Sequence, residues 1–238
     1  MTFRPLPVLT VATAIALAIL IALGTWQIER RVEKHALLAQ IDARSEAAPA
    51  PVEILLATGD YAAHRHATAL GTFAHDKEAY VYHPRTDDGP TRPGFKVLTP
   101  FELASGGTLL VDRGWIAEAS RDPVTRKKGE VAGEVELEGI LRPATKPGTF
   151  TPPPNAKDRI YYSRDSAEIA KALGLTLKSK LIFETTTKTE GGPEPLPSAL
   201  NIPDNHLQYA ITWFGLAIVL IVIYFRLHIV SGRLRFSR

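Results

Sequence analysis

The sequence predicts a membrane protein in which two transmembrane helices flank a β-rich α+β extracytoplasmic domain, built as a curved antiparallel sheet or a barrel-like sheet. Two uncharged apolar segments lie near the ends of the chain, and arginines follow the second one closely. Between them, residues 29–206 contain short segments of β character separated by turn formers. This stretch is long enough for one globular domain with its own core.

The composition of the 238 residues narrows the function classes. The chain has no cysteine, which excludes disulfides, thiolate chemistry and cysteine-based metal sites. Its formal net charge of +3 is small and dispersed, and no basic–aromatic motif is present, so nucleic acid is not an expected partner. Nucleophile-elbow, P-loop, zinc-protease and dinucleotide motifs are all missing, which favours a protein that is not an enzyme.

The first apolar segment, residues 5–28, is predicted to be a transmembrane helix. At about 1.5 Å rise per residue it can cross a hydrocarbon core of roughly 30 Å. A cleaved signal peptide is the alternative, because Arg4 precedes the segment and Ala22-Leu23-Gly24 resembles a cleavage site. The length of the apolar run, and its end at Trp26 followed by Arg30, favour a retained anchor.

The second apolar segment, residues 207–225, is also long enough to span a bilayer. It is followed by a basic tail, residues 226–238, which the positive-inside rule places in the cytoplasm. Arg4 indicates the same side for the other end. We therefore expect a multi-pass protein of the cell inner membrane, with both termini cytoplasmic and residues 29–206 in the periplasm.

The elements of the external domain follow from periodicity and from turn residues. A helix continues from the first span through about Arg44, and a proline-rich approach to the second span, residues 191–205, should stay extended. Asp165 with Glu168 forms a capping box for a helix that Gly174 ends. Strands are predicted at 66–73, 79–83, 95–103, 108–116, 134–141, 159–163 and 180–187, and the one internal helix at 165–173.

Two candidate sites lie within the domain. His64 and His66 are predicted on one strand face, where they form a possible metal pair, although the lack of a nearby third ligand favours exposed polar positions. Asp112 and Arg113 precede Gly114-Trp115, and a structural ion pair beside a packed tryptophan is favoured over a ligand site.

The start of the second span carries more polar and aromatic side chains than an anchor requires. At 100° per residue one helix face carries His206, Tyr209, Ala210, Trp213 and Ala217. The opposite face carries Gln208, Thr212 and Gly215, which suit contact with the first span. Trp213 lies about 10 Å deeper than His206, which an interfacial aromatic belt does not explain.

The first span brings Trp26, Gln27, Arg30 and Arg31 to the same end of the pair. An apolar slot with a neutral imidazole for iron and guanidinium groups for propionates suits a haem. The alternative is two anchors with interfacial Trp, Tyr, His and Arg residues, which accounts for most such residues in membrane proteins.

Four segments resemble the SURF1 family of cytochrome c oxidase assembly proteins. They are LGTWQIERRVEK (23–34), PGFKVLTPFEL (93–103) with LLVDRGWI (109–116), EVELEGILRP (134–143) and NHLQYAITWFG (205–215). The resemblance extends over the whole arrangement of span, external domain and span.

The resemblance implies an assembly factor for haem–copper (aa3-type) oxidase. Such a protein takes haem a from the membrane-bound haem A synthase and delivers it to oxidase subunit I, or stabilises it there. The isoprenoid tail of haem a makes membrane lipid a further partner. The expected haem site consists of His206, as the ligand of the iron, with Tyr209, Trp213, Trp26, Gln27 and Arg30.

One residue departs from the family pattern. Asp204 stands where an amide is expected, so a carboxylate lies near the haem ligand and could orient its imidazole by a hydrogen bond.

Two other functions stay open. The first is a membrane-tethered scaffold that binds oxidase subunits without binding haem, for which Arg113 and Trp115 matter more than His206. The second is an exported hydrolase or metal enzyme that uses His64 and His66.

Overall fold

The computed structural model describes residues 2–86, 89–197 and 204–235. The chain divides into two compact units. Residues 1–40 and 200–238 form a helical unit, and residues 41–199 form a β-rich unit. The part of the proline-rich approach at 198–203 lies outside the described residues.

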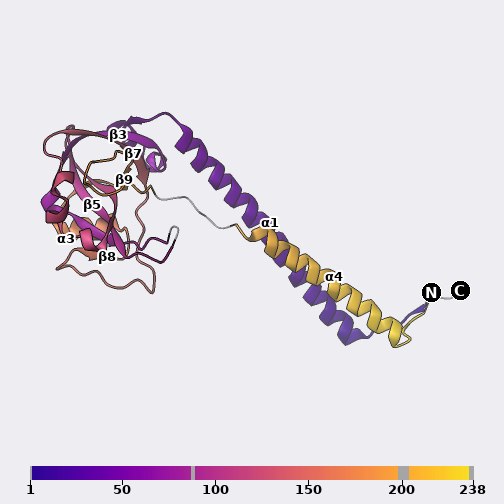
Figure 1. Ribbon diagram of the computed structural model, residues 1–238. Coiled ribbons are helices and arrows are strands. Elements are labelled where there is room, and N and C mark those ends of the chain that lie inside the picture. Colours follow the sequence, from indigo (N-terminus) through magenta and orange to yellow (C-terminus); the bar gives the residue numbers. More distant parts are fainter. Residues whose placement is uncertain (1, 87–88, 198–203, 236–238) are drawn as a thin grey trace. The chain divides into compact units, whose positions relative to one another are not determined.

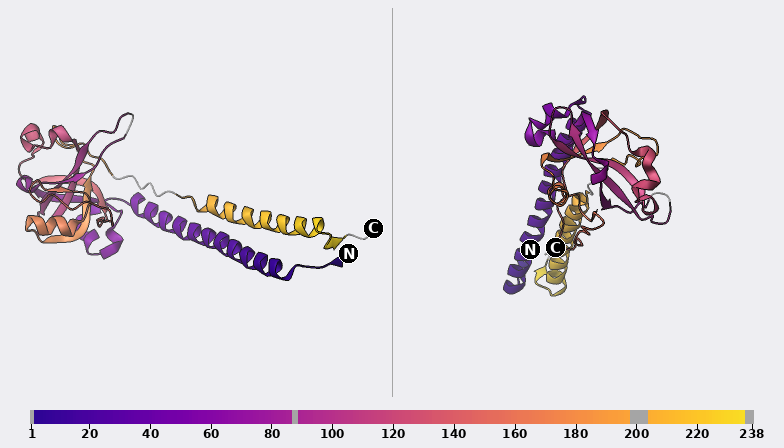
Figure 2. Two further views of the ribbon diagram at one scale, coloured as in Figure 1. Left: turned by 90° about the horizontal axis from the view of Figure 1, so that it is seen from below. Right: turned by 90° about the vertical axis from the view of Figure 1, so that its left-hand side faces the viewer.

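The helical unit contains α1 (Pro7–Glu46), whose last turn belongs to the β-rich unit, and α4 (His206–Val230), which run alongside each other (Figures 1 and 2). Both are long and apolar enough to cross a membrane, as predicted. α1 continues through its charged part without a break, because no proline interrupts it before Pro49. At the other end of the pair, β1 (Thr2–Phe3) and β10 (Leu234–Arg235) form an antiparallel ribbon.

The two helices meet along a seam with a spacing of three and four residues. On α4 the less exposed positions that follow this spacing are His206, Ala210, Trp213, Ala217, Leu220, Tyr224 and His228. On α1 they include Thr10, Thr13, Leu17, Leu20, Gly24, Gln27 and Arg31. This spacing is typical of helices that cross at a shallow angle. A Cβ at Gly24 would lie 2.7 Å from the Phe214 ring, so the glycine allows close approach there.

The β-rich unit is a closed barrel-like sheet, as the fold class predicted (Figure 1). Its ring consists of β3 (His66–Phe73), β5 (Gly94–Leu103), β6 (Thr108–Ala117), β9 (Leu177–Thr185) and β7 (Val135–Arg142), with β7 pairing back onto β3. The sheet extends through β4 (Ala79–Tyr82) and β8 (Ile160–Tyr161) on one side, and β2 (Ala50–Pro51) pairs with β3.

The expectation of a purely antiparallel sheet is wrong at three pairs. β6 with β9, β4 with β8, and β2 with β3 are parallel. Parallel neighbours need a crossover connection, and between β6 and β9 the chain supplies β7, β8 and α3 (Ser166–Leu173). Sequence periodicity reports which residues alternate between faces, but it does not report strand direction.

Apolar side chains from all five barrel strands fill the interior. They include Phe73, Phe101, Val111, Leu141 and Phe183, and α2 (Val52–Leu56) adds Val52 and Leu55. α3 covers the outer face of the sheet with Ile169, against Leu98, Leu110 and Ile182. The predicted alternation in 134–141 holds, since Leu137 and Gly139 are buried while Glu136 and Glu138 are exposed.

The ends of α3 are set by the residues that the sequence indicated. The Asp165 side chain accepts hydrogen bonds from the backbone N–H groups of Ala167 (3.0 Å) and Glu168 (3.4 Å). Gly174 ends the helix in the left-handed region, at φ 65°.

The described residues of the unit also include four short 3₁₀ helices. They are η1 (Gly59–Ala62), η2 (His75–Lys77), η3 (Glu118–Ser120) and η4 (Pro123–Gly129). η2 joins β3 to β4, and η3 and η4 lie in the connection from β6 to β7.

Candidate functional site

His206 is the first residue of α4, and its ring is held by α1. Its Nδ1 lies 2.8 Å from Oε1 of Gln27. Because an amide oxygen can only accept, Nδ1 carries the proton and donates to it. The lone pair of the neutral imidazole is then on Nε2, which is the nitrogen that can bind a metal. The contact joins residues 179 positions apart, so it fixes the ring relative to both helices.

Asp204 fastens the start of α4 to α1. Its Oδ1 accepts from the backbone N–H of His206 at 3.2 Å, and its Oδ2 lies 2.7 Å from Nε2 of His35 and 3.9 Å from Nε of Arg31. The hydrogen bond with His35, and then that with His206, lower the pKa of the Asp204 carboxyl. The sequence made Asp204 a candidate to orient the His206 ring by a hydrogen bond. In the structure Gln27 accepts the hydrogen bond from that ring instead. We call Gln27, Arg31, His35, Asp204 and His206 the helix-end cluster.

Trp213 lies on the same seam, seven residues further along α4. It is half-buried between Ala210 and Ala217, which are 1% and 5% exposed. Its Nε1 is buried and has no hydrogen-bond partner among the described residues. An indole N–H can only donate, so this position offers one donor to a group that the chain itself does not supply.

The expectation that Gln208, Thr212 and Gly215 contact the first span is wrong. Gln208 and Thr212 are exposed, and a Cβ at Gly215 would meet no atom within 4 Å. The face that packs on α1 is the one with Ala210 and Ala217, because small side chains let the helices approach.

The other predicted site residues lie at the same end of the pair but away from the seam. Trp26 and Tyr209 are about half exposed, at 50% and 55%. Arg30 points to Glu33, at 2.6 Å, on the surface of α1. The sequence reasoning missed His35, which follows Gln27 and Arg31 at four-residue intervals on one helix face. That spacing was the available signal.

A family model described as the SURF1 family matches residues 14–218. The chain belongs to the SURF1 family. Rat Surfeit locus protein 1 is 34% identical over 217 residues, which cover 86% of this chain and 70% of the rat protein. The human Surfeit locus protein 1 is 32% identical over 86% of this chain and 72% of its own length, and the SURF1-like protein of Rickettsia bellii is 31% identical over 88% and 86%. SURF1 proteins are generally cytochrome oxidase assembly factors, and the family is not known for an enzymatic activity.

The barrel of this SURF1 protein contains a buried ion cluster at Glu78. The Glu78 carboxylate accepts from Nη1 of Arg113 at 3.1 Å, from Nη2 of Arg126 at 2.5 Å and from the Tyr80 hydroxyl at 3.2 Å, and His75 approaches it at 3.9 Å. Burial by itself raises the pKa of Glu78, but the nearby His75 ring, the hydrogen bonds from Arg126 and the charges of Arg126 and Arg113 lower it to about 2. The carboxylate therefore stays ionised at neutral pH.

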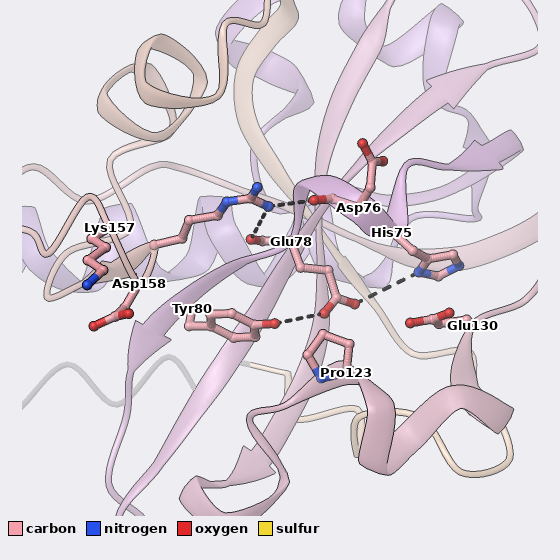
Figure 3. A pocket seen from close by; sticks show the side chains of 9 residues that line it. His75, Asp76, Glu78, Tyr80, Pro123, Glu130, Lys157 and Asp158 are labelled. Atoms are coloured by element: carbon pink, nitrogen blue, oxygen red, sulfur yellow. Dashed lines mark hydrogen bonds and ion pairs between the residues drawn. The ribbon is translucent and has the colours of Figure 1, made fainter.

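A cavity of about 520 Å³ lies beside this cluster, and Figure 3 shows Glu78 and Tyr80 meeting at its wall. Around the cavity stand His75, Asp76, Pro123, Glu130, Lys157, Asp158 and Arg159. The Arg159 guanidinium donates to the backbone carbonyl of Asp76 at 2.5 Å. The cluster fastens η2 and β4 to the connection from β6 to β7.

A second buried ion cluster lies beneath the start of α3. Lys96 lies 3.1 Å from Asp112 and 3.6 Å from Glu184, and Arg164, just before α3, lies 2.5 Å from Glu184. Arg142 approaches Glu184 at 3.4 Å. The predicted Asp112–Arg113 ion pair is therefore wrong. Successive residues of β6 point to opposite faces, so Asp112 and Arg113 enter different clusters.

Trp115 does pack as expected, at 7% exposure, and its Nε1 donates to the backbone carbonyl of His83 at 2.8 Å. The guanidinium groups of Arg85 and Arg92 lie over its ring, at 5.0 and 5.6 Å from the ring centroid.

His64 and His66 do not form a metal pair on one strand face. His64 precedes β3 in a left-handed turn, at φ 68°, and its Nδ1 lies 2.9 Å from Nη1 of Arg142. Within the described ranges no group of three or more His, Asp or Glu side chains is arranged to hold a metal ion.

Proposed function

We propose that this SURF1 protein assists assembly of aa3-type oxidase by binding haem a through His206 and passing it to subunit I. The observation that carries the proposal is the orientation of the His206 ring. Its Nδ1 donates a hydrogen bond to Gln27, so Nε2 keeps the lone pair that can bind a metal, at the end of a pair of apolar helices.

Three features of the helix pair support haem binding. The Trp213 indole offers a buried donor about 10 Å along α4 from His206, which suits a polar substituent of the macrocycle. Ala210 and Ala217 pack against α1, and the outer faces of both helices carry exposed apolar side chains that suit lipid and an isoprenoid tail. Arg31, whose Nε lies 3.9 Å from Asp204, and Arg30, whose exposed guanidinium lies 2.6 Å from Glu33, are the proposed partners of the propionates. When bound, the haem would supply a spectroscopic signature but no reaction at this site.

The proposal includes a topology. The arginines after α4 favour the cytoplasm for both termini, so that the helix-end cluster and the barrel lie in the periplasm of a cell inner membrane. Haem A synthase and oxidase subunit I are the proposed donor and acceptor, because haem a is exchanged between membrane-bound proteins.

The test is an absorption spectrum of the full chain, purified in detergent from a cell that makes haem a. We expect a Soret band that His206→Ala removes. His83→Ala is the matched control, because His83 is an exposed histidine of the barrel that is far from α4 in sequence and should leave the band unchanged. A variant at His206 that keeps the full spectrum would show that another residue holds the iron.

A colourless wild-type chain that still co-purifies with subunit I would favour the scaffold function. The structure gives little support to the residues first considered for it, since Arg113 and Trp115 are only 3% and 7% exposed.

A further inference from the structure

The barrel unit carries an aromatic patch that none of its own elements covers. Tyr82, at the end of β4, and Tyr162, just after β8, place their ring centroids 6.0 Å apart, and Phe95 packs edge-on against Tyr82 at 5.8 Å. The residues Gly148–Pro152 complete a shallow cavity of about 640 Å³ with these two tyrosines, and it is largely open to solvent. We call Tyr82, Tyr162 and residues 148–152 the aromatic patch.

Phe150 projects from this patch and is 97% exposed. Its loop begins at Pro147 and ends in three prolines, Pro152–Pro154, which restrict the backbone and lower the entropy that binding would cost. An exposed aromatic side chain on a proline-bounded loop next to a cavity of aromatic rings is the arrangement of an interface anchor and its pocket.

The side chains that line the cavity carry no charge. They are Tyr82, Thr149, Phe150, Thr151, Pro152 and Tyr162, with Gly148. A charged peptide would find no partner there, and the lining lacks the lysines and arginines with which loops usually bind anionic lipid. The occupant that the lining fits is an apolar aromatic side chain, and the chain presents one beside the cavity.

We propose that the aromatic patch is a self-association surface, on which Phe150 of one copy enters the cavity of a second copy of this chain. An anchor and a pocket side by side on one surface are complementary to themselves under a two-fold axis, so both copies make the same contact. Membrane anchoring by α1 and α4 confines copies to a plane and raises their effective concentration, so a small contact area suffices.

The proposal is tested by the oligomeric state of the full chain in detergent and in lipid nanodiscs, measured by mass photometry over a range of concentrations. We expect a dimer for the wild type. Because both Phe150 side chains leave water in the dimer, Phe150→Ser should raise the dimer dissociation constant about a hundredfold or more. Val124→Ser, which changes a 66% exposed valine on η4, should leave the dimer unchanged.

A second measurement identifies the surface. The chain has no natural cysteine, so Thr149→Cys gives a single spin-label position beside Phe150. In a dimer formed through the aromatic patch the two labels lie close together, and the short distance disappears when Phe150→Ser is added. Either of two results would overturn the proposal. One is a wild type that is monomeric, whether or not lipid contacts the spin label at position 149. The other is a dimer that survives Phe150→Ser.

Discussion

Replacing Glu78 by glutamine is expected to lower the free energy of unfolding of the barrel unit by about 3 kcal/mol at neutral pH. The pKa of Glu78 falls from an ordinary value of 4.5 to about 2 in the folded protein. At about 1.4 kcal/mol for each pKa unit, this difference corresponds to roughly 3 kcal/mol of preference for the ionised form. Removal of one partner from a buried ion pair costs a similar amount, about 3–5 kcal/mol.

The pH dependence of stability provides a second test of the role of Glu78. Because the folded pKa is depressed, the stabilisation is fully present above pH 4.5 and is lost as the pH falls towards about 2. Glutamine cannot titrate. The difference in unfolding free energy between wild type and variant should therefore be greatest at neutral pH and should shrink towards zero as the pH approaches the pKa of Glu78 in the folded protein.

The assay is urea unfolding of the full chain in detergent, followed by the fluorescence of Trp115. The chain has three tryptophans, and replacing Trp26 and Trp213 by phenylalanine leaves the buried Trp115 as the only reporter, inside the barrel unit. Glu102→Gln is the matched control, since Glu102 is exposed on β5 and its replacement should change stability by no more than about 0.5 kcal/mol.

Two results would refute the reasoning about Glu78. One is a loss below about 1 kcal/mol at neutral pH, which would mean that desolvation of the carboxylate offsets its ion pairs. The other is a difference between wild type and variant that stays constant from pH 7 to about pH 3, which would place its cause outside the titration of Glu78.

Two further predictions concern the backbone of the barrel unit. Gly114→Ala should destabilise it by about 2 kcal/mol or more, because Gly114 has φ 114° and a Cβ would lie 2.0 Å from the carbonyl oxygen of Glu194. Gly148→Ala, whose Cβ would meet only Thr151 at 3.7 Å, is the control, and equal melting temperatures for the two variants would contradict the prediction. Asp165→Ala should cost about 1 kcal/mol by removing the cap of α3, and Asp165→Asn, which still accepts a hydrogen bond, should restore most of the loss in the same melting experiment.

The sequence alone determined the two long apolar helices, the main strands and α3, in the order in which they occur, but it indicated neither α2 nor the short strands β1, β2 and β10. Uncharged runs of sufficient length specify the two membrane helices, because an apolar helix in lipid satisfies its own backbone groups. The strand at 66–73 was predicted with the bounds that β3 has. The helix predicted at 165–173 begins at Ser166, one residue later than predicted, with Asp165 as its cap. These features depend on local preferences, which residues close in sequence decide.

Local periodicity groups the residues of α4 into faces, but it does not predict which face packs on α1. The helical wheel grouped His206 with Ala210, Trp213 and Ala217, and these residues do share one face. Which face packs on α1 depended on the shape of the partner, since Gly24 accepts the Phe214 ring and the two alanines allow the approach. The His35–Asp204 contact joins residues 169 positions apart, which no local pattern reports.

Only the tertiary structure decided the buried charges and the closure of the barrel. Asp112 and Arg113 are adjacent in sequence, yet alternation along β6 sends one to Lys96 and the other to Glu78. A buried charge is tolerated only where distant chain segments supply its partners, so its position follows from strand pairing and not from its own neighbours. The parallel pairing of β6 with β9 has the same origin, because strand direction is fixed by how the chain closes on itself.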